Sequence, residues 1–140
     1  MQLNLKFDCD GIDFESVLQL LRSVGMGARS LEDHIQAFKA SRTVVFVFDG
    51  ELLIGVGRAI SDGVRQAAIF DCAVHREYQG KRIGTLILDA ILEREAGCDV
   101  TLFAVPGKEG FYEKLGFRAM KTAMAKFTRE AAMRESGYIE

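Results

Sequence analysis

Cysteine is scarce in this sequence, and the three residues present, Cys9, Cys72 and Cys98, lie far apart. They form no CxxC pair and no Cys/His cluster, so the sequence predicts neither a disulfide framework nor a metal site. No apolar run approaches the length of a membrane span, and no apolar leader stands at the N-terminus. We therefore expect a cytoplasmic protein with no membrane partner.

An excess of either charge is also missing. The chain has 18 Lys and Arg residues against 20 Asp and Glu residues, for a formal net charge of -2. Proteins that bind nucleic acid or anionic membranes through their overall field carry a strong excess of basic residues. The sequence therefore predicts no nucleic-acid partner, and any anionic ligand must be held by a local site.

Internal repeats, low-complexity stretches and Pro/Gly-rich linkers are absent as well. A chain of 140 residues has the size of one domain. Hydrophobic residues make up 49% of it, enough for a core without a metal or disulfide. The sequence predicts one domain over residues 1–140, and its C-terminal strand and tail could mediate a homodimer.

Hydrophobic periodicity predicts two helices and then a run of antiparallel strands in the first half. Apolar residues recur with helical spacing in the first helix, and Ser30 is the expected N-cap of the second. Asp49-Gly50 is a strong hairpin signal between two β-branched runs. The expected elements are helices over residues 13–23 and from 30 onward, and strands over residues 43–48, 52–60 and 67–74.

The second half of the sequence predicts a helix that connects two parallel strands. Apolar positions with 3.6-residue spacing follow Ile83, and Gly97 is the expected end of that helix. The next strand is almost continuously apolar, so we expect it inside the sheet and parallel to the strand before the helix. The order is then α-α-β-β-β-α-β-α-β, a mixed sheet covered by helices. The later elements are a strand over residues 100–105, a short helix over 108–115, a last strand over 117–127 and a frayed or loosely helical tail.

Residues 74–84 combine glycine and basic residues at a strand-to-helix junction. The first turn of a helix has unpaired N–H groups and a partial positive charge, which together bind anions. Gly80 and Gly84 leave room for a bulky anion, and Lys81 and Arg82 add charge. Neither GxxxxGK(S/T) nor GxGxxG occurs, which excludes a Walker loop and disfavours a Rossmann site. The geometry suits a diphosphate, although such a junction also arises by chance.

Residues 107–117 form the second informative segment. Phe111 and Leu115 are spaced to face the core of a short helix, with Tyr112 beside them. Tyr112 is then either an amphipathic residue at the edge of the core or a phenol that returns a proton to a leaving thiolate.

Together, the two segments resemble the GNAT N-acetyltransferases. Residues 79–84 are similar to the acyl-CoA signature Q/R-x-x-G-x-G/A, and residues 111–117 to the FYxxxGF motif. Within the family, fragments at residues 58–62, 70–74 and 101–104 are similar to plant serotonin N-acetyltransferases and their small bacterial relatives. The resemblance covers about residues 10–127.

The resemblance implies an enzyme that transfers acetyl from acetyl-CoA to a small-molecule primary amine, by direct attack in a ternary complex. It implies that the strand ending at Val74 splays from the strand over 100–105, and that the pantetheine arm lies in the gap. Tyr112 matches the tyrosine that protonates the CoA thiolate. The implied cofactor-binding residues are Cys72, Ala73, Val74, Gln79, Gly80, Lys81, Arg82, Ile83, Gly84, Thr85, Tyr112 and Lys114.

Arg82 is the one departure, because it stands where the signature has its middle glycine. We expect a limited effect, since a position at the start of a helix needs an ordinary negative φ that arginine adopts. Its guanidinium could also pair with a phosphate.

The general base and the acceptor contacts are less well marked. Asp71 lies on the strand beside the expected acyl site and is the first candidate base, or it faces solvent or bonds a neighbouring strand. Asp62, at the turn beside Arg58, could instead bind the ammonium group of the substrate, and Arg58 is the second candidate for binding the substrate. Cys72 has no basic partner placed by the sequence, so a buried, inert thiol is expected. His34 is expected on the surface of its helix.

Two alternatives to a small-molecule enzyme remain open. A non-catalytic acyl-CoA-binding or sensing domain would carry the same CoA signature, because fold does not fix function. Tyr112 favours an enzyme over a sensor. A protein N-acetyltransferase would be expected to show an acidic groove for a basic peptide, and the acids here are scattered.

Overall fold

The structure, a computed structural model, describes all residues from 1 to 140. The chain forms two compact units, residues 1–102 and residues 103–140. The first unit holds the sheet and three α-helices, and the second holds two short helices. That the whole chain acts as one domain stays a prediction.

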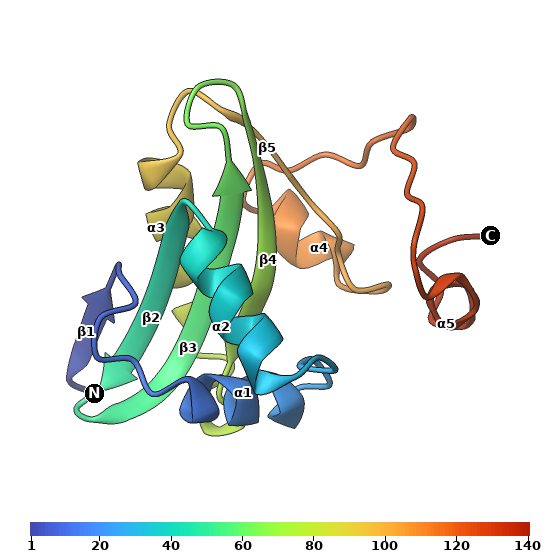
Figure 1. The fold of residues 1–140 in the computed structure, drawn as a ribbon. Helices are drawn as coiled ribbons and strands as arrows, with labels where there is room; N and C mark the ends of the chain where they lie inside the picture. The colour runs from blue at the N-terminus through green and yellow to red at the C-terminus, as the bar shows by residue number, and fades with distance from the viewer. The chain divides into compact units, whose positions relative to one another are not determined.

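A five-stranded mixed sheet forms the frame of the first unit, with the strand order β1-β2-β3-β4-β5 (Figure 1). Its first four strands form an antiparallel meander. β5 runs parallel to β4, because the chain crosses back through a helix between them. The mixed α/β fold is as predicted. The strands are β1 (Leu3–Lys6), β2 (Thr43–Asp49), β3 (Leu52–Ser61), β4 (Gln66–Val74) and β5 (Asp99–Leu102).

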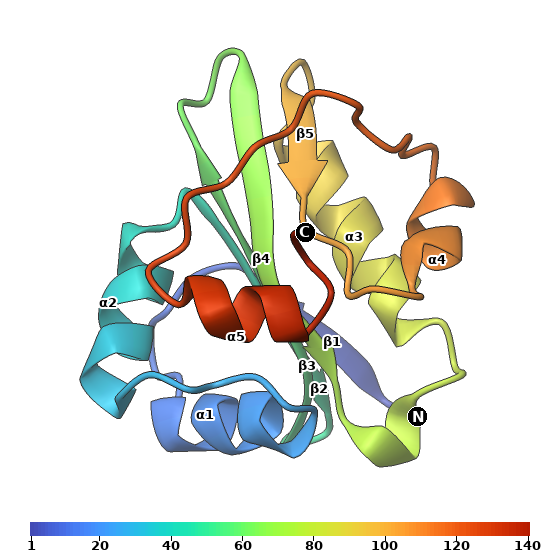
Figure 2. The ribbon, with the colours of Figure 1, turned by 90° about the vertical axis from the view of Figure 1, so that its right-hand side faces the viewer.

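Helices cover both faces of this sheet, with α1 and α2 on one side and α3 on the other (Figure 2). Under α1 and α2, the rings of Phe14, Phe38 and Phe46 pack with centroids 5.6–6.2 Å apart. No helix is long and apolar enough to cross a membrane. The helices of this unit are α1 (Phe14–Ser23), α2 (Leu31–Ala40) and α3 (Ile83–Arg94), and a 3-10 turn, η1 (Arg76–Tyr78), precedes α3.

The predicted helix start and hairpin are both confirmed. Ser30 Oγ accepts a hydrogen bond from the Asp33 N–H at 3.1 Å and caps α2. Gly50 has a φ of 59° in the turn between β2 and β3, next to their last pair, Asp49 with Leu52. A glycine is favoured there because a Cβ disfavours positive φ.

Two glycines of β3 let α3 lie close against the sheet. A Cβ built on Gly55 would lie 2.8 Å from Ile87 Cδ1, and one built on Gly57 would lie 2.7 Å from Ile87 Cγ2. Real Cβ atoms do not approach other atoms so closely, so both positions require glycine at this helix-to-sheet distance. This contact fixes the start of α3 relative to the ends of β3 and β4.

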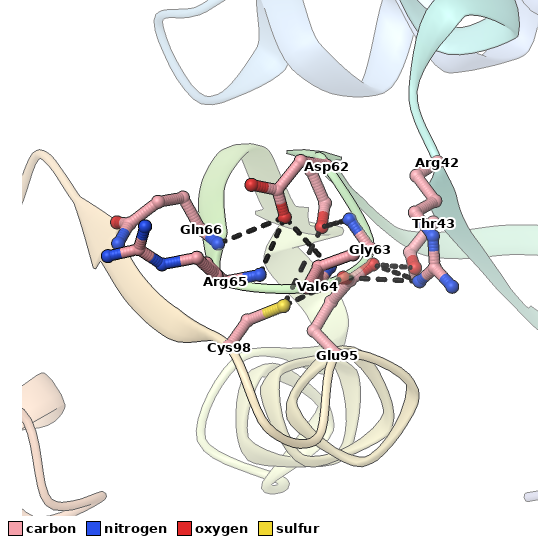
Figure 3. Close-up of polar contacts among 10 residues, drawn as sticks. Arg42, Thr43, Asp62, Gly63, Val64, Arg65, Gln66, Glu95 and Cys98 are labelled. Carbon is pink, nitrogen blue, oxygen red and sulfur yellow. Dashed lines mark hydrogen bonds and ion pairs between the residues drawn. The ribbon is translucent and has the colours of Figure 1, made fainter.

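The C-terminal end of α3 is held by an ion pair between a buried carboxylate and a partly exposed arginine near the β3–β4 turn (Figure 3). The carboxylate of Glu95 is fully buried and lies 3.2 Å from Arg42 Nη1. Burial alone would raise the pKa of Glu95, but hydrogen bonds from Ser61, Thr43 and Arg42 outweigh it and the pKa is lowered. The charged form is therefore the stable one above the ordinary carboxyl pKa, and it ties α3 to β2 and β3.

The second unit contains α4 (Glu109–Glu113) and α5 (Glu130–Glu135) and no strand. The expected last strand over residues 117–127 is therefore wrong, and the tail is helical where α5 forms. Met120 and Met124 are 60% and 97% exposed, so this segment does not bury the apolar face that a strand needs.

Two further differences concern the edges of the sheet. β1 was not predicted; two of its four residues are exposed, none is fully buried, and it pairs only with β2. β5 was expected inside the sheet over residues 100–105, but it is shorter and lies at the edge. Without a strand over residues 117–127, nothing extends the sheet beyond β5.

Candidate active site

A β-bulge interrupts β4 at its centre. Arg58 of β3 pairs with Phe70, whereas Val56 pairs with Ala73, so two residues of β4 oppose one of β3. The first of them, Asp71, has a φ of 56°, in the left-handed region. Aspartate is among the few residues with a side chain that occupy this region readily. The bulge bends β4 and redirects its side chains from this point on.

Beyond the bulge, β4 loses its neighbour on one side. The parallel ladder with β5 ends at the pair Ile69–Leu102, whereas β4 continues to Val74. The main-chain groups of Cys72 to Val74 therefore have no β5 partner. β5 itself is paired with β4 along its whole length and then ends, so the splay of the two strands that the resemblance implies stays a prediction.

Arg58 and Asp71 form an ion pair at the bulge. Arg58 Nε donates to Asp71 Oδ2 at 2.7 Å, and the two side chains are 13% and 22% exposed. Arg58 Nη1 also donates to Ser41 Oγ at 3.3 Å. Asp71 therefore bonds a neighbouring strand, and its role as the general base stays a prediction. The carboxylate oxygen Oδ1 takes part in none of these bonds.

The loop between β4 and α3 is tied back to the sheet. Gln79 Nε2 donates to the carbonyl oxygen of Val74 at 3.0 Å, which closes the loop onto the end of β4. The Tyr78 hydroxyl donates to Asp49 Oδ2 at 2.6 Å. That bond raises the pKa of Tyr78 and lowers that of Asp49. The start of α3 is thus held beside the free end of β4.

The N-terminal turn of α3 has the features of a diphosphate site. Leu86 donates to the carbonyl of Arg82, so the N–H groups of the three preceding helical residues lack a helical acceptor. No acidic residue stands in this turn. A Cβ built on Gly80 would meet nothing within 4 Å, so the space beside that residue is open. Ile83 is buried against the sheet, and only its main chain can serve a ligand.

The expected backbone at Arg82 is wrong. Arg82 caps α3 with φ 65° and ψ 20°, the left-handed conformation, rather than with a negative φ. The family glycine at this place avoids a Cβ cost that arginine must bear. The side chain itself is exposed and forms no ion pair, so its charge is free for a ligand.

We predict that Arg82→Gly stabilises the protein by about 0.5–1 kcal/mol, the relief of left-handed strain less the added backbone entropy of glycine. Its melting temperature should rise by a few degrees. Arg82→Ala removes the guanidinium but keeps the strain, so it should show no such rise. An equal or greater rise in Arg82→Ala would contradict the assigned backbone. Calorimetric scans of the three proteins make the comparison.

A pocket of about 480 Å³ opens between α2 and the bulge. His34 is part of its wall, and the expectation that His34 lies on the surface is wrong: the residue is 6% exposed. Its Nε2 atom is buried and has no hydrogen-bond partner within the protein. The lining residues are Arg29, Asp33, His34, Gln36, Ala37, Ala40, Arg58 and Asp71.

Other residues singled out in the sequence have local structural partners. Asp62 Oδ1 accepts the N–H groups of Val64, Arg65 and Gln66 in the β3–β4 turn, and Arg58 pairs with Asp71 rather than with Asp62. Burial raises the pKa of the Cys72 thiol to about 12, as expected of an inert thiol. No three His, Cys, Asp or Glu side chains form a group that could hold a metal ion.

In the second unit, the FYxxxGF motif builds the end of α4. The Phe117 N–H donates to the Tyr112 carbonyl at 3.1 Å, the Gly116 N–H donates to the Glu113 carbonyl at 3.1 Å, and Gly116 has a φ of 95°. This is a Schellman motif, and the Tyr112 and Phe117 rings pack with centroids 6.0 Å apart. Glycine and the second phenylalanine thus orient Tyr112. Lys114 is exposed directly after α4.

Comparison with known proteins identifies the family to which a chain with this fold and these motifs belongs. The Acetyltransferase (GNAT) domain matches residues 39–119. The chain belongs to the GNAT family. Relatives are N-acetyltransferases, and acetyl-CoA-dependent transfer is typical of the family.

Two relatives and one solved structure show how far the likeness extends. The N-acetyltransferase ycf52 of Pyropia yezoensis is 30% identical over an alignment 129 positions long, which covers 78% of this GNAT chain and 74% of that protein. Histone acetyltransferase TAP1 of Glycine max is 39% identical over an alignment 71 positions long, which covers 48% of this chain but only 30% of that protein. A GNAT family acetyltransferase of Streptococcus pneumoniae is 25% identical, with a TM-score of 0.78, and covers 91% of this chain and 98% of its own.

Sequence reasoning missed two features of this GNAT site. It did not pair Arg58 with Asp71, although opposite charges on neighbouring strands were a usable signal. It also missed the buried His34, although its spacing, three residues after Leu31 and four before Phe38, places it on the apolar face of α2.

Proposed function

We propose that this protein acetylates a small amine that carries further polar groups, and that the amine binds in the pocket between α2 and the β4 bulge. Charged or polar side chains supply six of the eight lining residues, and the other two are alanines. The alanines, Ala37 and Ala40, leave space along one side of α2. The pocket, with Asp71 in its wall, is the observation that carries this proposal.

His34 supports a polar acceptor. Buried polar atoms in proteins nearly always have a hydrogen-bond partner, so an unpaired Nε2 at 6% residue exposure calls for one. A hydroxyl, amide or carboxylate of the acceptor would supply it. An aromatic amine would leave the imidazole and the charged lining residues without partners, which is costly.

The residues of the first unit fit a bound acyl-CoA. The unpaired N–H groups at the start of α3, with Lys81 and Arg82, would hold the diphosphate. The main-chain groups of Cys72 to Val74 would hold the pantetheine arm. Acetyl-CoA supplies the activated acetyl group, and the protein supplies its orientation, which accounts for a large part of catalysis.

Asp71 and Tyr112 are the proposed proton carriers. Asp71 takes one proton from the acceptor ammonium, which frees the nitrogen lone pair to bond the acetyl carbonyl carbon. Tyr112 gives its proton to the CoA sulfur as the carbon–sulfur bond breaks, and the phenolate recovers a proton from the acylated nitrogen. The proton on Asp71 passes to water. The products are the amide, CoA with a free thiol, and one released proton.

An acceptor panel tests the substrate class. Thiol release from acetyl-CoA should be fastest with polar amines such as glucosamine, spermidine and lysine, and slow with tryptamine. The expected kcat/KM difference is at least about tenfold, because it corresponds to one or two buried polar groups left unpaired. Faster turnover of tryptamine than of every polar amine would contradict a polar acceptor pocket.

A protein substrate is the second candidate, because one relative is named a histone acetyltransferase. A lysine-rich peptide belongs in the same panel for this reason. If the peptide exceeds all small amines, a protein acceptor replaces the small one. If no amine is acetylated although acetyl-CoA binds, the chain is an acyl-CoA sensor.

A further inference from the structure

Asp71 occupies an unusual backbone position at the proposed reaction centre. It is one of two non-glycine residues with positive φ, and it begins the bulge opposite Gly57. Aspartate enters the left-handed conformation more readily than most residues with a Cβ, but within a strand this conformation persists only where the surroundings hold it. Something must therefore hold this residue in place.

Arg58 provides that restraint from the neighbouring strand. Its Nε donates to Asp71 Oδ2, and its Nη1 donates to Ser41 at the end of α2. The guanidinium carbon lies 5.8 Å from the centroid of the Phe38 ring and 5.3 Å from that of the Phe70 ring. A planar guanidinium held by two hydrogen bonds and two rings has little freedom to move.

The arrangement leaves one carboxylate oxygen unused. Arg58 bonds only to Oδ2 of Asp71, and Oδ1 receives no hydrogen bond within the protein. Both residues line the pocket between α2 and the bulge. An ammonium group that entered the pocket would find an oriented carboxylate with one free oxygen.

We propose that Arg58 is a positioning residue that acts through Asp71, holding its carboxylate so that Oδ1 receives the acceptor ammonium. This rests on the proposed function, because it assigns Arg58 a part in the proton transfer by Asp71. It replaces the expectation that Arg58 itself binds the substrate. Ser41, Phe38 and Phe70 are the groups that fix Arg58 in turn.

A double-mutant cycle tests the proposal. Arg58→Met keeps the aliphatic stem but removes the charge and both hydrogen bonds. Asp71→Asn tolerates positive φ and can still accept from Arg58, but it cannot take a proton. The single and double variants are assayed for kcat and KM with spermidine and with lysine, for CoA affinity, and for melting temperature.

If Arg58 acts through Asp71, the two changes will not be additive. Asp71→Asn should lower kcat by about 10²–10⁴, the usual worth of a positioned base. Arg58→Met should lower kcat by about 10–100-fold in the native background and by less than about threefold with Asn at position 71. CoA affinity should be unchanged, and Arg58→Lys should recover part of kcat.

Three other outcomes would overturn the proposal, and each points to a different reason. Additive losses in kcat would mean that Arg58 does not act through Asp71. A rise in KM for lysine but not for spermidine would show that Arg58 binds the substrate carboxylate directly. If the wild-type protein acetylates no amine at all, the proposed function fails and the inference fails with it.

Arg42→Met is the matched control for a loss of stability. Arg42 also forms an ion pair with a buried carboxylate, that of Glu95 at the end of α3, the helix that covers the face of the sheet opposite α2 (Figure 3). It should lower the melting temperature and leave kcat and KM unchanged. If Arg42→Met lowers kcat as much as Arg58→Met does, general destabilisation explains both and the positioning role is overturned.

Discussion

Tyr112→Phe should lower the turnover rate by about 10²–10⁴ while CoA affinity and melting temperature change little. The substitution removes the proton that the CoA thiolate would receive, but it keeps the ring that packs 6.0 Å from Phe117 and 5.1 Å from Phe111. Steady-state kinetics, calorimetry and thermal unfolding on the two proteins give the three quantities.

The controls for this variant separate chemistry from packing. Tyr138→Phe removes another half-buried hydroxyl of the same unit and should leave turnover unchanged. With an acyl donor whose leaving group needs no proton, the loss of turnover rate in Tyr112→Phe should be smaller. A lowered melting temperature with nearly intact turnover would instead show that the Tyr112 hydroxyl is structural.

Gly84→Asp should weaken CoA binding by about a hundredfold or more. A carboxylate at this position in the first turn of α3 would lie against the diphosphate, and a like charge there costs several kcal/mol, where each 1.4 kcal/mol is about tenfold in affinity. Isothermal titration with CoA measures the change.

This variant is expected to fold well, which makes the loss interpretable. An acidic residue in the first turn of a helix stabilises it by about 0.3–1 kcal/mol through the helix dipole. Gly84→Ala is the matched control, because it adds a Cβ without charge and favours the helix. If Gly84→Asp binds CoA as tightly as Gly84→Ala does, the start of α3 is not the phosphate site.

Local sequence signals predicted most of the first unit. Ser30 marks the start of α2 because its hydroxyl can bond a nearby N–H, and Asp49-Gly50 marks a hairpin because glycine allows a positive φ. The glycine and basic residues around the start of α3 predicted an anion site for the same kind of reason. Each of these features depends on neighbours in the sequence.

The missed features depend on contacts between residues far apart in the sequence, or on a backbone conformation that the residue type disfavours. The Arg58–Asp71 pair joins two strands across a bulge that no periodicity reveals. Arg82 adopts a left-handed backbone that propensity argues against. Residues 117–127 have strand-forming residues but remain largely exposed and pair with no strand in the second unit.

The central claim is that the protein transfers acetyl directly from acetyl-CoA to an amine. The most direct test mixes the protein with acetyl-CoA labelled in the acetyl group, first alone and then with spermidine, glucosamine or lysine. The account predicts no stable label on the protein in the first mixture and labelled amide, with one free CoA thiol for each amide, in the second. Label retained on the protein without amine, or bound acetyl-CoA with no labelled amide from any acceptor, would contradict it.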